Sequence, residues 1–148
     1  MPTHFIGTPQ QVLALDTFIK FTRASNAFES RLLRRNVLED LTISQFGVLE
    51  ILLHLGPMCQ SDLGSKLLKS GGNITLVVDN LEKRGLVRRQ TDASDRRMTN
   101  VLLTPTGEEL IKRIFPEQVK SIVEEFNVLS AEEQEIFGKL CKKLGKQA

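Results

Sequence analysis

Apolar side chains recur at helical spacing along the N-terminal third of the chain. From about Gln10 to Leu38 this spacing predicts one long first helix. A second helix should begin at Thr42 or Ser44, because either hydroxyl can accept a hydrogen bond from the exposed N–H groups of a first turn, and Gly56-Pro57 should end it. The apolar stripes of the two helices are Phe18, Phe21, Phe28 and Leu32 for the first, then Phe46, Leu49 and Leu53 for the second.

Two shorter helices are predicted in the centre of the chain. Leu63 and Leu67 share one face of the first, and Lys69-Ser70-Gly71-Gly72 supplies a polar turn after it. The next helix carries apolar residues on one side only, so its other face should be exposed, and Gly85 should terminate it. Its apolar stripe is Ile74, Val77, Val78 and Leu81, and the opposite face holds Asn73, Thr75, Leu76, Asp79 and Lys83.

Residues 86–91 and 98–103 form two strand-like runs. The segment 92–97 between them is rich in turn-forming residues and ends in two arginines, which predicts a hairpin with a basic tip. Thr104 should cap a further helix with Pro105 in its first position, and Pro116 should bend that helix. The apolar positions of the helix are Ile111, Ile114 or Phe115, Val119, Ile122 and Phe126.

Ser130 and Glu133 form a capping box for a last helix. The apolar positions of this helix are Ile136, Phe137, Leu140 and Leu144. The expected order is therefore four helices, a hairpin and two helices. This is a mainly α fold with a small β-hairpin, of the α+β class, and 148 residues joined by short connections predict a single domain.

Charge is distributed unevenly along the chain. The net charge is only +2, yet residues 60–97 hold eight Lys and Arg against five Asp and Glu, whereas the segments on either side are neutral or slightly acidic. A basic centre is typical of a nucleic-acid-binding protein, because Lys and Arg displace counterions from phosphates. Two short helices with a tight turn, followed by a hairpin with a basic tip, match a winged helix-turn-helix.

The remaining chemistry excludes several other classes. No apolar run reaches the roughly 20 residues that cross a bilayer, and the first residues lack the pattern of a signal peptide, so we expect a cytoplasmic protein with no membrane contact. Two histidines and two cysteines are too few for a metal site or a disulfide framework. No phosphate-binding glycine motif or nucleophile elbow is present, so we expect no enzyme activity, no metal and no cofactor.

The central segment resembles the signature of the MarR family of transcription regulators, and the resemblance covers nearly the whole chain. The matching residues are Leu63, Leu67, Thr75, Val78, the run from Leu81 to Arg89, Asp95-Arg96-Arg97 and Leu103-Thr104. The segments 42–46 and 70–75 are most similar to the branch that responds to quinones and related electrophiles. The resemblance implies that residues 42–104 form the DNA-binding lobe and that residues 10–38 and 105–146 form dimerisation helices.

The resemblance also implies which residues contact DNA. Ser70, Asn73, Thr75 and Leu76 would meet base edges or phosphates at the start of the recognition helix, where an amide can pair with adenine and a leucine can meet a thymine methyl. Gly71 and Gly72 would allow the backbone to approach the strand. Lys69, Arg84, Arg88 and Arg89 are candidates for phosphate contacts or internal ion pairs. Arg96 or Arg97 would enter a minor groove, and Asp95 would orient a neighbouring arginine.

The cysteines leave two interpretations open. Cys59 and Cys141 are most simply small buried apolar residues, since neither belongs to a CxxC pair. Peroxide-sensing relatives carry a reactive cysteine in the first helix, and the segment 10–38 contains none. Redox or electrophile sensing at Cys59 or Cys141 therefore remains the alternative.

The terminal helices carry longer apolar stripes than one small core can cover, which predicts a homodimer. A two-fold dimer would place two recognition helices in successive major grooves of double-stranded DNA, on a pseudo-palindromic operator with half-sites about 10 bp apart. A small aromatic or phenolic effector, bound between the dimerisation helices and the DNA-reading lobe, could relieve repression by favouring an incompatible spacing. A non-specific architectural DNA binder and a protein-binding winged helix are the competing hypotheses.

Overall fold

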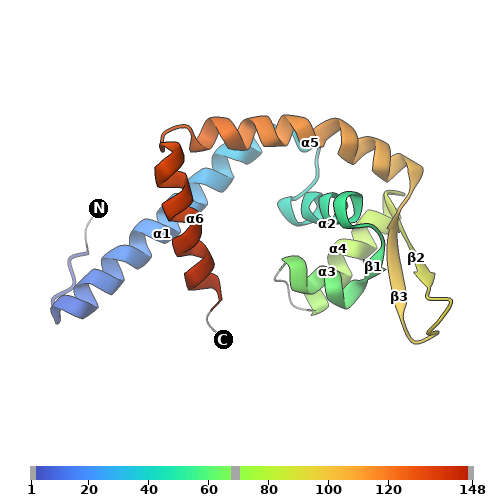
Figure 1. The fold of residues 1–148 in the computed structure, drawn as a ribbon, viewed down its shortest axis with the longest axis horizontal. Helices are drawn as coiled ribbons and strands as arrows, with labels where there is room; N and C mark the ends of the chain where they lie inside the picture. The colour runs from blue at the N-terminus through green and yellow to red at the C-terminus, as the bar shows by residue number, and fades with distance from the viewer. Residues whose placement is uncertain (1–2, 68–70, 147–148) are drawn as a thin grey trace. The chain divides into compact units, whose positions relative to one another are not determined.

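The computed structural model describes residues 3–67 and 71–146, which fold into six helices and three strands (Figure 1). In chain order these are α1 (Pro9–Arg34), α2 (Ile43–Leu55), β1 (Met58–Cys59), α3 (Gln60–Leu67), α4 (Gly71–Lys83), β2 (Val87–Thr91), β3 (Thr99–Leu103), α5 (Pro105–Phe126) and α6 (Ala131–Gly145). The expected order of four helices, a hairpin and two helices is confirmed. The contacts divide the chain into two units, the first made of residues up to Asn36 together with those from Lys120 onward, and the second of Val37–Val119.

Side-chain caps define the starts of several helices, as the sequence predicts. Thr42, and not Ser44, caps α2: its hydroxyl accepts from the Gln45 backbone N at 3.0 Å, and the Gln45 side chain accepts from the Thr42 backbone N at 3.0 Å. Ser130 and Glu133 form the same reciprocal pair at α6, at 3.1 and 2.9 Å. Each cap satisfies N–H groups that have no partner within the helix.

The first helix is shorter than its periodicity predicts. It ends at Arg34 instead of Leu38, and Asn36, Glu39 and Asp40 then adopt left-handed backbone conformations with φ of 54°, 50° and 71°. The chain leaves the helix here because Leu38 and Leu41, each 4% exposed, are buried in the core of the second unit. Tertiary burial thus overrides a helical pattern that continues in the sequence.

The sheet contains one strand more than the expected hairpin. Its order is β1-β3-β2, with both pairs antiparallel, and β1 pairs Met58 with Val101 and Cys59 with Asn100. A two-residue strand is too short to show an alternating pattern, so the sequence gives no signal for it. Both hairpin strands begin one residue later than expected. Leu86 closes the end of α4 by donating from its backbone N to Leu81 O at 3.0 Å, and the Met98 backbone N donates to Asp95 O at 3.0 Å within the hairpin turn.

Two further expectations are modified. Gly71 and Gly72 were expected in a turn but form the first residues of α4, while Lys69 and Ser70 lie outside the described residues. Pro116 lies inside α5, and the helix continues through it to Phe126. Gly85 ends the α4 region with φ of 72°, a conformation that glycine adopts without a steric penalty.

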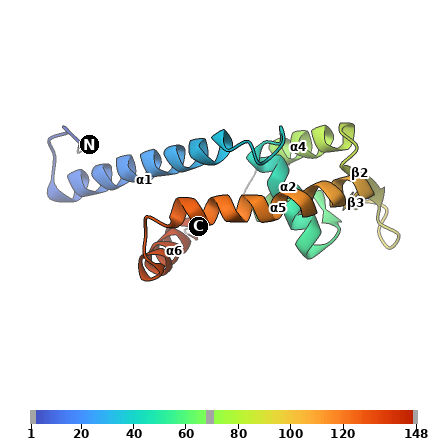
Figure 2. The same ribbon diagram turned by 90° about the horizontal axis from the view of Figure 1, so that it is seen from above.

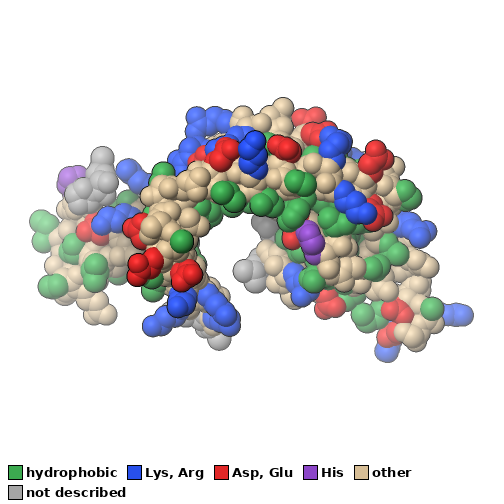
Figure 3. Space-filling model, turned by 45° about the horizontal axis from the view of Figure 1, so that its top comes forward, with side chains coloured by type: hydrophobic (Ala, Val, Ile, Leu, Met, Phe, Trp, Pro, Cys, Tyr) green, Lys and Arg blue, Asp and Glu red, His purple; other side chains and the backbone are tan. Residues whose placement is uncertain are grey.

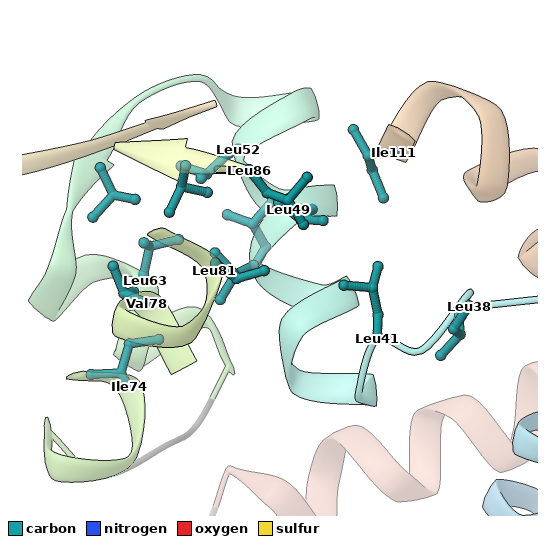
Figure 4. Close-up of a cluster of buried hydrophobic side chains, with 14 of the residues drawn as sticks. Leu38, Leu41, Leu49, Leu52, Leu63, Ile74, Val78, Leu81, Leu86 and Ile111 are labelled. Carbon is teal, nitrogen blue, oxygen red and sulfur yellow. The ribbon is translucent and has the colours of Figure 1, made fainter. Parts of the chain in front are cut away.

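One hydrophobic core holds the second unit together (Figure 4). Side chains from α2, α3, α4, the strands and the first part of α5 converge there, and Leu49, Leu63, Ile74, Leu81 and Ile111 are fully buried. These are the stripe positions that the sequence assigns to the helix interiors. The polar face of α4 is thereby fixed on the side away from this core.

The first unit has much less buried apolar surface among its described residues. Leu32 is its buried aliphatic residue, and Phe126 packs against Phe28 and Phe137 with ring centroids 4.6 and 6.5 Å apart. α1 is a single long helix (Figure 2), and its last residues bind α5 through ion pairs. Arg35 contacts Glu124 and Glu125, and Arg31 contacts Glu125, so the pKa of the Glu125 carboxyl is lowered by Arg31 first and Arg35 second.

Candidate nucleic-acid interface

The first turns of α4 present an exposed face of mixed chemistry. Ile74 and Val78 are buried at 1% and 0% exposure, which turns Asn73, Thr75 and Leu76 outward. Leu76 is 61% exposed although it is a large apolar residue. An amide, a hydroxyl and an isobutyl group side by side can contact base edges and a thymine methyl.

A hydrogen-bond network beneath this face joins α3, α4 and β2. Arg89 on β2 donates to Asp79 at 2.6 Å and to Glu82 at 2.9 Å, both on α4. Its Nη2 also donates to Gln60 Oε1 at 3.1 Å, and Gln60 Nε2 donates to Thr75 Oγ1 at 2.7 Å. Arg89 is therefore engaged in internal ion pairs, one of the two roles expected for it.

Sequence reasoning missed Gln60 altogether and did not assign Asp79 and Glu82 to Arg89. A signal was available for the acidic pair, since residues three apart on a helix lie on the same face, next to a strand that carries arginines. No sequence signal identifies Gln60, because its role depends on how α3 packs against β2.

The other basic candidates differ in their surroundings. Arg84 follows α4, and its Nη1 donates to the backbone oxygen of Asp40 at 3.4 Å. Arg88 is exposed on β2, with no acidic partner among residues 3–67 and 71–146. Arg88 is thus the more available of the two for an external anion.

Asp92 organises the tip of the hairpin. Its Oδ1 accepts from Ser94 Oγ at 2.6 Å and from the backbone N of Ser94 at 2.8 Å, and its Oδ2 accepts from Asn100 Nδ2 at 3.1 Å. These hydrogen bonds, with those from Ser94 the largest cause, lower the pKa of the Asp92 carboxyl to about 2. The tip of this β2–β3 hairpin, which is the wing of the winged helix, is therefore held by an ionised carboxylate at physiological pH.

Asp95 pairs with Arg97 at the same tip. Arg97 donates to Asp95 Oδ1 from its backbone N at 3.0 Å and from Nε at 3.2 Å, while its side chain stays 91% exposed. Arg96 is exposed and has no ion-pair partner within the described part of the chain. Basic side chains project from the wing tip at the lower right of Figure 3.

An open hollow of about 410 Å³ lies between α4 and the wing in the second unit. Cys59, Gln60, Ser61, Thr75, Arg89, Arg97, Met98 and Thr99 line it. One concave surface is therefore bordered by two residues that are expected to contact DNA. They are Thr75 on the recognition helix and Arg97 on the wing.

The two cysteines are free and differ in environment. Cys59, on β1, is buried at 8% exposure, and its Sγ lies 3.2 Å from Ser61 Oγ. Cys141 is half-buried on α6. In the described ranges no cluster of three or more His, Cys, Asp or Glu side chains could hold a metal ion, and no described helix is long and apolar enough to cross a membrane.

Comparison with known families agrees with this geometry. The MarR family description matches residues 41–99, from the residue before the α2 cap to the first residue of β3. The HTH-type transcriptional regulator MhqR of Bacillus subtilis is 35% identical over 135 residues, which cover 91% of this chain and 93% of MhqR.

Solved structures share the fold of this chain. A mutant MarR from Escherichia coli, crystallised with operator DNA, has a TM-score of 0.78 at 24% identity, covering 88% of this chain and 95% of that one. BpsR of Bordetella bronchiseptica, whose DNA binding is regulated by 6-hydroxynicotinic acid, has a TM-score of 0.81 at 24% identity and covers 100% of both chains. Both likenesses establish a winged-helix fold for this chain.

Proposed function

Because the chain belongs to the MarR family and is a DNA-binding transcription regulator, we propose that it is a repressor that binds a pseudo-palindromic operator as a homodimer. The observation that carries this proposal is the pairing, within one unit, of an exposed polar face on α4 with a basic wing tip. The recognition helix would read the major groove while the wing reaches the adjacent minor groove. The same proposal places the protein in the cytoplasm, where its DNA would lie.

Base contacts are assigned to the start of α4, and phosphate contacts to the residues around it. Asn73, Thr75 and Leu76 would read base edges. The backbone of Gly71 and Gly72, together with Lys69, Ser70, Arg84 and Arg88, would meet phosphates. Phosphate contacts add affinity and salt dependence, whereas base contacts add sequence preference.

Of the two wing arginines, we assign minor-groove insertion to Arg97. Asp95 holds the backbone N and Nε of Arg97, which orients a guanidinium that is otherwise exposed. An arginine held in advance loses less rotamer entropy on binding than a free one. Arg96, which has no such holder in the described ranges, would contribute mainly to phosphate binding.

Selection of bound duplexes from a random pool tests the proposal. The native protein should enrich a pseudo-palindrome with half-sites about 10 bp apart. Arg97→Ala should lose preference for A·T pairs at the wing position, and Arg96→Ala should weaken binding similarly for all sequences. The matched control removes two exposed charges elsewhere, Lys142→Ala with Lys143→Ala on α6, and should leave the enriched sequence unchanged.

If no sequence is enriched from the pool, the proposal of a sequence-specific regulator is refuted and an architectural DNA binder is favoured. An enriched sequence without two-fold symmetry would refute the dimeric arrangement alone. Either result is read directly from the selected duplexes.

The homodimer is supported by apolar side chains that the first unit leaves exposed. They are Leu13, Phe18, Phe21, Leu33, Val123, Val128, Ile136, Phe137, Leu140 and Leu144, each at least 43% exposed. So many large apolar residues on one small unit indicate an interaction surface. Leu140→Asp should yield a monomer by sedimentation analysis, and a dimer that persists would argue against α6 as its interface.

A small aromatic or phenolic effector is supported by Gln118 on α5. This side chain is 4% exposed, and its Oε1 has no hydrogen-bond partner among the described residues. A buried amide oxygen without a donor is costly, and a phenolic hydroxyl could supply that donor. Gln118→Leu should keep operator binding but reduce its release by phenolic compounds, and an unchanged response would exclude Gln118 as a contact.

Sensing of electrophiles through cysteine is a separate proposal. Cys59 lines the hollow beside α4, so a bulky adduct on its sulfur would alter the same surface that faces DNA. Cys59→Ser and Cys141→Ser should each be compared with the native protein for quinone-induced release from the operator. Loss of the response in one variant would identify the reacting thiol, and retention in both would assign the response to non-covalent binding.

A further inference from the structure

The side-chain amide of Gln60 connects two parts of the DNA-reading surface. Gln60 is the first residue of α3, and its amide lies between Thr75 on the recognition helix and Arg89 on the first strand of the wing. The two hydrogen bonds measure 2.7 and 3.1 Å. One neutral side chain thus touches both elements that the proposed function brings to DNA.

The direction of these bonds is fixed by chemistry. A guanidinium has only donors, so the amide oxygen of Gln60 has to face Arg89. The amide NH₂ therefore faces Thr75, whose hydroxyl oxygen accepts. A free threonine hydroxyl can donate or accept as it rotates, but here one lone pair is already committed to Gln60.

Arg89 is itself held firmly, so the amide has a rigid support. The guanidinium binds Asp79 at 2.6 Å and Glu82 at 2.9 Å, and the Arg89 backbone N donates to Glu82 at 3.0 Å. Charge-assisted hydrogen bonds of this kind are shorter and stronger than neutral ones. A change in the wing strand would therefore be transmitted through Gln60 to Thr75.

We propose that Gln60 is a positioning residue for base recognition, which sets the side-chain orientation and hydrogen-bonding sense of Thr75 at the DNA-facing start of α4. This inference rests on the proposed function and adds a residue that the family resemblance does not assign. Gln60 and Thr75 both border the hollow between α4 and the wing, so the positioned hydroxyl is accessible from the DNA side. Gln60 would not contact DNA itself, and its effect on base recognition would pass through Thr75.

The test compares binding of the selected operator with binding of its single-base-pair variants at one salt concentration. Gln60→Met keeps the volume but removes both hydrogen bonds. Gln60→Glu keeps an acceptor for Arg89 but cannot donate to Thr75, so it removes the hydrogen bond to Thr75 alone. Thr75→Val removes the hydroxyl and keeps the shape, and Ser61→Ala on the same helix as Gln60 is the control.

We expect Gln60→Met to reduce discrimination at one base pair of each half-site by about threefold to tenfold, the value of one neutral hydrogen bond. Thr75→Val should affect the same base pair, and the double variant should lose no more than either single variant, because coupled residues are non-additive. Gln60→Glu should alter the preference at that base pair, with a thermal midpoint close to the native one. Ser61→Ala should leave the base preference unchanged.

Uniform weakening over all base pairs, or additive losses in the double variant, would overturn the inference and make Gln60 only structural. If the native protein selects an operator and the Gln60 variants read it unchanged, the inference fails while the proposed function stands. If the native protein selects no sequence, the proposed function fails and the inference fails with it.

Discussion

Gly107 lies in the first turn of α5, where this helix starts against the base of the wing. A Cβ atom at this position would lie 1.9 Å from Leu86 O and 2.8 Å from the Leu86 carbonyl carbon. Unbonded carbon and oxygen atoms stay about 3.3 Å apart even in close contacts. Gly107→Ala therefore requires the helix start and the Leu86 backbone to separate by roughly 1 Å or more.

Both sides of this contact are held in place. Leu86 is 5% exposed, and its carbonyl oxygen accepts from the Thr104 backbone N at 3.1 Å. Overpacking of this kind costs about 1–3 kcal/mol, and loss of the Thr104 hydrogen bond adds about 0.5–1.5 kcal/mol. Alanine regains about 1 kcal/mol over glycine in a helix, so the expected net loss is about 0.5–3.5 kcal/mol in the free energy of unfolding.

Urea unfolding followed by far-UV circular dichroism measures this loss, since the chain contains no Trp or Tyr for fluorescence. The matched control is Gly138→Ala on α6, where no atom lies within 4 Å of the new Cβ. The control should be as stable as the native protein or more stable by up to about 1 kcal/mol. Equal or increased stability of Gly107→Ala would refute the steric argument.

Two further predictions concern the wing and its support. Arg89→Met should lower the free energy of unfolding by about 1–3 kcal/mol, because it leaves two carboxylates and an amide oxygen without their donor. Arg88→Met, at an exposed position, should change the free energy of unfolding by less than about 0.5 kcal/mol. Equal effects of the two substitutions in urea unfolding would contradict this. The Asp92 carboxyl, with its pKa lowered to about 2, stabilises the wing above its unfolded pKa near 4 and loses this contribution as pH falls through 2. An NMR titration of the Asp92 carboxyl carbon should show a midpoint near pH 2. Asp92→Asn should reduce the dependence of the thermal midpoint on pH between 4 and 2, and the part that stays comes from other carboxylates such as Glu125. A midpoint near 4 for Asp92 would contradict the hydrogen-bond argument.

Regular periodicity and caps made most of the fold predictable. The stripe of Ile74 and Val78 identified the buried side of α4, and the Ser130 and Glu133 box placed the start of α6 correctly. These signals are local, so the sequence displays them directly. The end of α1 was not predictable, because it depends on Leu38 entering the core of another unit.

The candidate site was predictable as a region but not as a network. The exposed residues of α4 followed from the pattern, and the family resemblance implied that Asp95 orients a neighbouring arginine. Only the structure identifies that arginine as Arg97. The support beneath them did not, because Gln60 meets Thr75 and Arg89 across 15 and 29 positions of the chain. Contacts of this range depend on tertiary packing, which periodicity does not encode.

The division of the chain into a continuous and a discontinuous unit also sets an order of folding during synthesis. Residues 37–119 form one continuous stretch, so their core can form without the residues that follow them. The first unit has to wait, because α1 pairs with residues that follow much later: the hydrogen bond from Arg31 to Glu125 spans 94 positions. α1 is therefore synthesised before the second unit but finds its partners on α5 only after it. Until then Phe28 of α1 lacks the ring of Phe126, against which it packs in the folded chain.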